Sequence, residues 1–161
     1  MTVTLAELRR QFPRAGEVIW IGLRPARRAD IEVVDEATLS PQEGLVGDRY
    51  GGRSSKRQVT LIDEAHLAAA ASYLGRDTLD PALVRRNIVV RGINLRALKE
   101  GHFRVGSATL VYTDECHPCS RMEEVLGPGG YNALRGHGGI CARVLSGGVV
   151  RRGDPVTALP D

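Results

Sequence analysis

Short runs of β-branched residues, separated by glycine, restrict the fold of this chain more than any other feature of its sequence. The 161 residues include 19 glycines, a share well above the average of roughly 7%. Strands are predicted within 16–23, 30–37, 58–63 and 102–113, the last run turning at Gly106. With the remaining short runs the count is about seven or eight strands, and helical patterns do not alternate regularly with them. The predicted fold is therefore mainly β (α+β), a small closed or partly closed β-barrel with about two or three peripheral helices.

Capping residues mark where helices begin outside the strands. Thr4 followed by Glu7 fits a capping box and predicts a short helix near the N-terminus. Asp63 is a suitable N-cap for the alanine-rich segment that follows it, and Gly75 is a suitable end for that helix. Near the C-terminus, the pattern of residues 136–156 predicts a strand, a Gly-Gly turn and a second strand.

Length, composition and charge limit the class of protein. Residues 1–161 fit a single domain, with the short helix within 1–15 and the barrel over 16–158. The net charge of +3 and an aromatic content of 4% argue against a nucleic-acid partner. No apolar run has the length of a membrane helix, no apolar leader begins the chain, and three cysteines do not make a disulfide framework. We therefore expect a cytoplasmic protein with reduced thiols and no membrane contact.

The basic residues are almost all arginine. Lys and Arg total 22, yet Lys56 and Lys99 are the only lysines. Biased codon usage is one explanation of this excess. Arginine is also the better residue for a forked grip on carboxylate or phosphate, so some of these side chains are expected to line an anion site.

The segment TDECHPCSRMEE carries the candidate chemistry. Pro118 stops a helix from entering from upstream, so a helix in SRMEEVL would begin directly after Cys119. A thiol at a helix N-terminus has a lowered pKa, and its thiolate is both a nucleophile and a metal ligand. His117 and Arg121 add positive charge nearby, whereas three glutamates act in the opposite direction. Cys119 is therefore the first candidate for a catalytic or metal-binding residue, with Cys116 and His117 beside it.

Three other interpretations of the Cys116–Cys119 pair remain open. The first is a structural zinc site, completed by two ligands from among His102, His137 and Cys141, although no second ligand pair with regular spacing is present. The second is a thiol–disulfide couple of the C-x-x-C type, which normally follows a strand in a βαβ context. The third is a set of inert buried cysteines.

Five segments then identify a family resemblance. In chain order they are EGLVGDRY, RQVTLID, RRNIVVRG, TDECHPCSRME and RVLSGGVVRRGDPV, and this order resembles the MOSC domain. That domain is found at the C-terminus of molybdenum cofactor sulfurases, in the mitochondrial amidoxime-reducing component and as stand-alone bacterial proteins. The resemblance extends over residues 16–158 and implies a β-rich, barrel-like fold, in agreement with the pattern of strands.

The resemblance also implies a function. The family is associated with the molybdenum cofactor and with carrying sulfur, and its amidoxime-reducing members use the cysteine at the position of Cys119 as a molybdenum ligand. The implied activity is persulfide carriage or molybdenum ligation by Cys119, as a sulfurtransferase or a reductase of N-hydroxylated compounds. A non-catalytic module for cofactor binding and handover is the alternative. The implied partners are a small molecule and a redox partner or sulfur-donor protein. The aminotransferase-like domain of the sulfurases is absent from this sequence, so no pyridoxal phosphate is expected.

A phosphate-bearing pterin needs cations and backbone N–H donors. The long loop over 41–57 supplies glycines for close backbone approach and an Asp48 carboxylate that we expect to orient Arg49. Arg85 and Arg86 precede a strand; because adjacent strand residues point to opposite faces, we expect only Arg86 to face the site. A surface ion-pair set is the alternative for these arginines. The candidate cofactor-binding residues are Gly47, Asp48, Arg49, Arg86, Asn87, Arg121 and His137.

Overall fold

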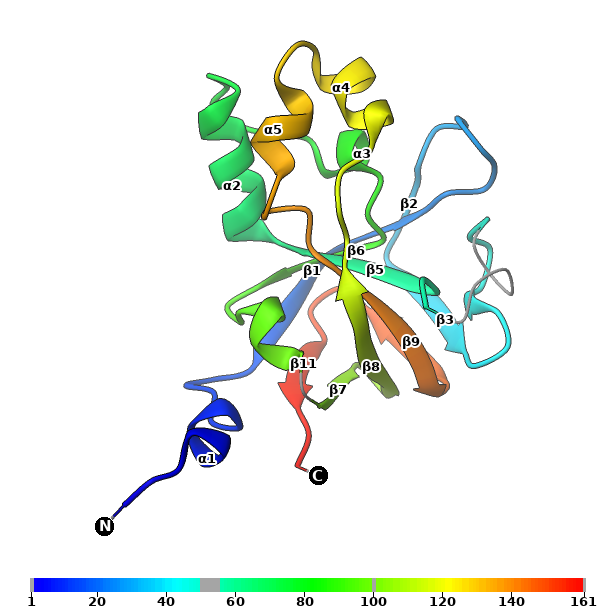
Figure 1. The fold of residues 1–161 in the computed structure, drawn as a ribbon. Coiled ribbons are helices and arrows are strands. Elements are labelled where there is room, and N and C mark those ends of the chain that lie inside the picture. Colours follow the sequence, from blue (N-terminus) through cyan, green and yellow to red (C-terminus); the bar gives the residue numbers. More distant parts are fainter. Residues whose placement is uncertain (1, 50–55, 100, 161) are drawn as a thin grey trace.

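A computed structural model of the chain describes residues 2–49, 56–99 and 101–160. Within these residues seven strands close into one mixed barrel, because β1 pairs with both β6 and β11 (Figure 1). Around the barrel the order is β1 (Gly16–Leu23), β6 (Ile88–Arg91), β5 (Val59–Asp63), β9 (Ile140–Ser146), β8 (Ala108–Glu115), β7 (His102–Val105) and β11 (Pro155–Ala158). The β5–β6 pair is parallel and the other pairs are antiparallel. The predicted fold class is confirmed.

Four further strands lie beside the barrel. β2 (Glu32–Val34) pairs with the end of β1, and β10 (Gly148–Arg151), β3 (Glu36–Ser40) and β4 (Gly44–Leu45) form a separate three-stranded sheet. The single strand predicted over 30–37 is therefore wrong, because the chain bends at Asp35 and changes sheet. The predicted strands of 136–156 exist, but β10 pairs with β3. Residues 50–55 of the predicted loop lie outside the described residues.

Five short α-helices occur in the described residues, where the sequence predicted two or three. They are α1 (Leu5–Arg9), α2 (Glu64–Tyr73), α3 (Pro81–Val84), α4 (Ser120–Leu126) and α5 (Gly130–Leu134), with a 3-10 turn η1 (Leu95–Leu98). The predicted caps form: the Thr4 hydroxyl accepts the Glu7 N–H at 3.1 Å, and the Asp63 carboxylate accepts the Ala65 N–H at 2.9 Å. Figure 1 shows α2 to α5 together at one end of the barrel, while α1 lies at the other end near both termini.

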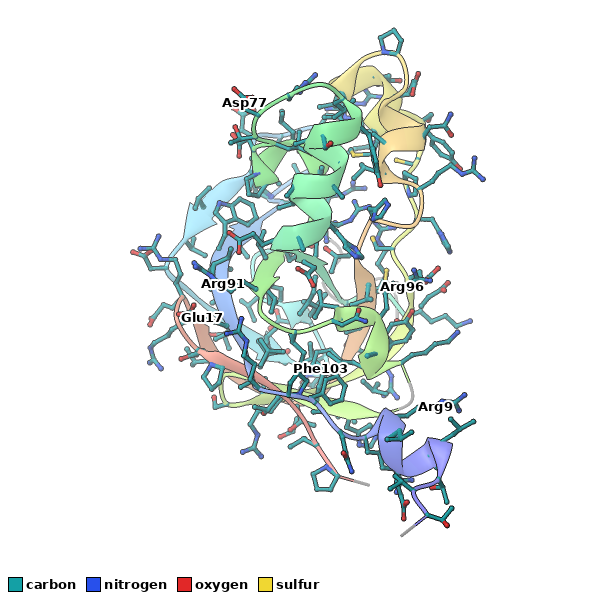
Figure 2. All side chains as sticks on the ribbon, turned by 90° about the vertical axis from the view of Figure 1, so that its left-hand side faces the viewer. Arg9, Glu17, Asp77, Arg91, Arg96 and Phe103 are labelled. Atoms are coloured by element: carbon teal, nitrogen blue, oxygen red, sulfur yellow. The ribbon has the colours of Figure 1, made fainter. Side chains whose placement is uncertain are left out.

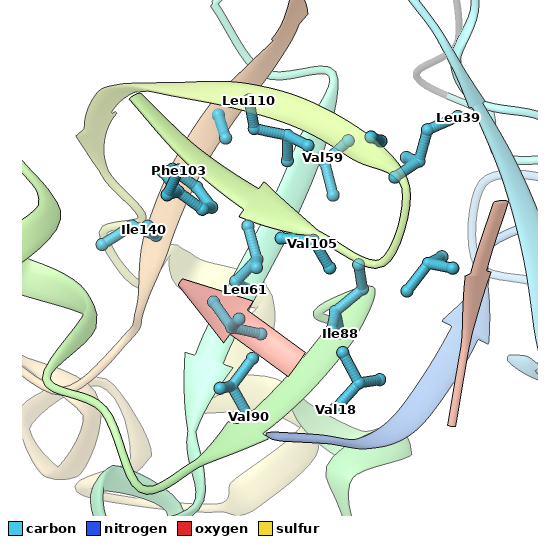
Figure 3. Close-up of a cluster of buried hydrophobic side chains, with 14 of the residues drawn as sticks. Val18, Leu39, Val59, Leu61, Ile88, Val90, Phe103, Val105, Leu110 and Ile140 are labelled. Carbon is cyan, nitrogen blue, oxygen red and sulfur yellow. The ribbon is translucent and has the colours of Figure 1, made fainter. Parts of the chain in front are cut away.

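Two apolar clusters hold these parts together. The first fills the barrel and includes Leu61, Ile88 and Phe103 (Figure 3). The second joins the barrel wall to the helices and includes Ile62 and Val89. Strands β5 and β6 thus place alternate side chains in the two clusters. The helices are therefore fixed against the barrel, and the connections between helices and strands have defined positions.

Charged side chains surround this core. In Figure 2, Glu17 and Arg91 lie near each other on the outside of the barrel, where their side chains are 3.5 Å apart, and Arg9 extends from α1. No described helix has the length and apolar character needed to cross a membrane.

Candidate functional site

A hollow of about 360 Å³ opens where four connecting segments meet near α3 and α4. Its lining comes from the segment after β1, from the two described ends of the 45–58 connection, from the α3–β6 junction and from the start of α4. Among the described residues, one thiol, one carboxylate and eight guanidinium groups line it. They belong to Cys119, Glu124, Arg24, Arg27, Arg28, Arg49, Arg57, Arg85, Arg86 and Arg121.

A buried ion pair lies beneath this hollow. Arg24 donates to both carboxylate oxygens of Asp48, from Nε at 3.0 Å and from Nη2 at 2.9 Å, and its backbone N–H donates to Oδ1 at 2.8 Å. The side chain of Asp48 is fully buried and that of Arg24 is 3% exposed. The bidentate geometry holds the segment after β1 against the one after β4. The sequence suggested Asp48 as a partner of Arg49, and the structure pairs it with Arg24.

Asn87 completes this frame. Its side-chain oxygen accepts from Arg24 Nη2 at 3.0 Å and from the N–H and hydroxyl of Thr60, both at 3.1 Å. Its amide nitrogen donates to the Gly22 carbonyl at 3.0 Å and to Asp48 Oδ1 at 2.9 Å. Asn87 is fully buried and joins β1, β5 and β6 from below. It supports the hollow and does not line it.

Arg85 and Arg86 both line the hollow, so the expectation that only one of them faces the site is wrong. Arg85 ends α3 in a left-handed conformation with φ 56°, which breaks the strand alternation assumed from the sequence. Its guanidinium donates to the carbonyl oxygens of Ala29 at 2.6 Å and Ala26 at 3.4 Å. Burial and repulsion from Arg121 and other guanidinium groups lower the pKa of Arg85.

Arg86 is 4% exposed and is held by three backbone carbonyls. It donates to Gly138 at 2.7 Å, to Val84 at 2.8 Å and to Cys116 at 3.3 Å. Burial lowers the pKa of this guanidinium. Arg86 thereby fixes the start of the cysteine segment against the glycine loop, and this contact sets where Cys119 enters the hollow.

Cys119 and Cys116 occupy different surroundings. Cys119 is the N-cap residue of α4, is exposed and lines the hollow. Cys116 is buried and shares a hydrogen bond with the buried thiol of Cys141. That hydrogen bond, helped by the charge of Arg86, lowers the pKa of Cys116 to about 5, while the same contact raises the pKa of Cys141.

All three cysteines are free. No group of three or more His, Cys, Asp or Glu side chains among the described residues could hold a metal ion, so the zinc site expected from Cys116, Cys119 and two further ligands is not assembled. Cys116 and Cys119 differ in burial and in partners, and no disulfide joins them.

The other candidate residues fall into two groups. Arg49, Arg86 and Arg121 line the hollow together with Cys119, and Asp48 and Asn87 lie beneath it. The remaining three lie elsewhere. His137 packs against His66 with ring centroids 5.0 Å apart, His117 borders a separate small cavity, and Gly47 adopts a φ of 92° outside the lining.

Of the eight arginines in the described lining, sequence reasoning placed three at the site and missed five. Arg24, Arg27 and Arg28 follow β1 in the segment RPARR, and Arg57 precedes β5. An arginine cluster directly after a predicted strand was the available signal. Glu124, which lies 3.7 Å from Arg28 and 3.6 Å from Arg121, was noticed only as a nearby acid.

A closed mixed barrel with a cation-lined, thiol-bearing hollow at the helical end defines the class of protein. The family model of the MOSC domain matches residues 43–157, and the chain belongs to this family. A comparison with curated proteins finds no match.

Solved structures show the same fold. The YUAD protein from Bacillus subtilis is 19% identical, with a TM-score of 0.77 over 89% of this chain and 94% of that one. YiiM from Geobacillus stearothermophilus is 18% identical, with a TM-score of 0.71 over 90% and 75% of the two chains. YiiM from Escherichia coli is 19% identical, with a TM-score of 0.69 over 92% and 71%. At these identities the likeness concerns the fold.

Proposed function

We propose that the hollow binds the molybdenum cofactor through its phosphate and that the Cys119 thiolate acts at the metal end, as a carrier of sulfane sulfur. The observation that carries this proposal is that, in the described part of the chain, one exposed thiol and eight guanidinium groups line the same cavity. Membership of the MOSC family, which is associated with molybdenum cofactor sulfurase-like proteins, supports it.

The chemistry of the lining fits this cofactor. Guanidinium forks match the oxygens of a phosphate in a bidentate way, and a thiolate is a soft ligand suited to a metal that accepts sulfur. The volume of about 360 Å³ lies within the usual range for small-molecule sites, roughly 300–1,000 Å³. When bound, the cofactor would supply a metal centre for two-electron chemistry or for sulfur acceptance.

The residues of the chain divide this task. Arg27 and Arg28 are exposed at the hollow and are placed to bind the phosphate, together with Arg121 on α4. The Arg24–Asp48 pair holds the floor in place beneath them. Arg86, through its bond to the Cys116 carbonyl, orients the segment that presents the thiol.

Cofactor content of purified protein tests the binding proposal. Protein produced in a host that makes the cofactor should contain pterin and molybdenum near one per chain. Arg27→Ala combined with Arg121→Ala should lower pterin content, because both side chains line the hollow. Arg152→Ala, an exposed arginine beside Asp35, should leave it unchanged. Wild-type protein without pterin would refute the proposal.

A molybdenum-ligand role for Cys119 is the second candidate, because the exposed thiol borders an open cavity with room for a substrate. In that role the protein would reduce N-hydroxylated compounds with electrons from a redox partner. Cofactor-loaded protein should then reduce benzamidoxime to benzamidine, and Cys119→Ser should not. Pterin binding without such turnover and without selective alkylation of Cys119 near neutral pH would leave a non-catalytic handover module.

A further inference from the structure

The composition of the hollow also restricts the compound that delivers sulfur to Cys119. The inference rests on the proposed role of Cys119 as a sulfur carrier. The described lining contains eight arginines and a single carboxylate, that of Glu124, which is itself divided between Arg28 and Arg121. A cavity with this charge concentrates small anions and accelerates their arrival. A neutral compound gains nothing from that field.

Of the three cysteines, all of them described, only Cys119 lines this hollow. Cys116 and Cys141 are 2% and 5% exposed and hydrogen-bond to each other. The glycine loop covers Cys116 closely, since a Cβ added at Gly138 would overlap the Cys116 carbonyl. An anion that enters the hollow therefore meets one thiol among the described residues, that of Cys119.

We propose that Cys119 accepts its sulfur from a small anionic sulfane compound with an oxyanion leaving group, of which thiosulfate is the simplest. The protein is accordingly a thiosulfate sulfurtransferase in its loading step. The thiolate attacks the outer sulfur of thiosulfate and forms a new S–S bond. The original S–S bond breaks, its electron pair leaves with sulfite, and Cys119 carries a persulfide anion. Atoms and charge balance without a further oxidant or reductant.

The arginines act on both ends of this step. They hold the donor dianion beside the thiolate, although both reactants are negative and would repel each other in open water. They also accept the sulfite dianion as negative charge leaves the breaking S–S bond, which is where donors lower a barrier most effectively. A protein-bound persulfide donor would release only a thiolate, which matches guanidinium forks less well than the oxygens of sulfite do.

The buried frame explains why the arginines remain in place during the step. Arg85 donates to the Ala29 carbonyl, and Arg86 donates to the carbonyls of Gly138 and Cys116. These hydrogen bonds fix the positions of both charges before an anion arrives. Arg27, Arg28 and Arg121 are the more exposed members of the lining and are the ones placed to contact the donor directly.

Sulfur loading can be measured without any bound cofactor. The reduced protein is incubated with thiosulfate at low ionic strength. Sulfite release reports the leaving group, cyanide-labile sulfur reports the persulfide, and the intact mass of the protein reports the number of added sulfur atoms. We expect one added sulfur atom per chain, located on Cys119, and none in Cys119→Ser. Arg27→Ala and Arg121→Ala should each slow loading about 10-fold, and added salt should slow the wild type, because both weaken the attraction of the anion. Arg152→Ala should load at the wild-type rate.

A parallel reaction with a cysteine desulfurase and cysteine separates the two proposals. Loading by the desulfurase but not by thiosulfate would overturn the donor inference and keep Cys119 as a sulfur carrier. Absence of loading by either would overturn both the inference and sulfur carriage, whereas cofactor binding is measured separately by pterin content. Loading by thiosulfate at a rate indifferent to the arginine variants and to salt would also contradict the inference.

Discussion

Replacing Asp48 with Asn tests whether the buried pair with Arg24 holds the hollow together. The variant keeps the shape of the side chain but removes its charge. In the wild type both carboxylate oxygens accept hydrogen bonds from Arg24, at 2.9 and 3.0 Å, whereas in the variant an amide N–H₂ replaces one of these acceptors. The Asp48 side chain is fully buried and the Arg24 side chain is 3% exposed, so water does not compensate. Breaking one partner of a buried pair costs about 3–5 kcal/mol. For a chain of this size that loss lowers Tm by about 10 °C.

The measurement is thermal and urea unfolding of wild type and variant at the same pH. Glu36→Gln is the matched control, because its partner Arg151 lies 3.0 Å away while both side chains are more than 60% exposed; exposed pairs contribute about 0–1 kcal/mol. The double variant Arg24→Met with Asp48→Leu should recover only part of the loss, because the buried Asn87 amide and the backbone N–H of residue 24 lose their Asp48 acceptor. An Asp48→Asn protein as stable as the Glu36→Gln control would refute the reasoning.

Three further predictions concern the thiol pair, the glycine loop and a helix cap. In a Cys119→Ser background, absorbance of the Cys116 thiolate near 240 nm should persist well below pH 9, and Cys141→Ala should move the midpoint up because it removes the hydrogen-bond donor. Since the folded pKa is the lower one, this ionisation favours the fold fully above pH 9 and progressively less as the pH falls toward 5. Gly138→Ala should destabilise by about 1–3 kcal/mol in urea unfolding, because its Cβ overlaps the Cys116 carbonyl and not a movable side chain. Asp63→Ala should cost about 1 kcal/mol through loss of the α2 cap, and an unchanged midpoint would contradict that role.

The barrel was predictable because its strands carry local signals. Most residues of β5 and β6 are apolar, since alternate side chains enter the barrel and the helical layer, and Asp63 and Arg91 end the two runs. The strand error at 30–37 has a local cause as well. The residues from Val33 to Glu36 show no break in their sequence pattern. The chain nevertheless bends at Asp35, and the parts before and after the bend pair with strands of different sheets. Composition does not show such a change of partner.

The lining of the hollow was less predictable because it depends on contacts between distant segments. Arg24 and Asp48 meet only when β1 and the segment after β4 are both in place. Arg85 has a positive φ although it is neither glycine nor asparagine, so its sequence gives no sign of that conformation. The expectation that adjacent side chains alternate between two faces therefore failed at this residue. Cys119 was identified because the proline before it and the helix after it are adjacent in the sequence. Its separation from Cys116 required knowing that Cys141 lies on the neighbouring strand β9.

The two kinds of arginine in this hollow explain how so many like charges fold together. Burying a guanidinium is costly unless its donors are satisfied, and Arg24 and Arg86 meet this condition through Asp48, Asn87 and three backbone carbonyls. The exposed Arg27 and Arg28 remain partly hydrated and cost less. Burial, together with repulsion among the cations, still lowers the pKa of Arg85. An anion that enters the hollow removes this repulsion, so binding should stabilise the fold, and the Arg27→Ala protein should gain less from the same anion.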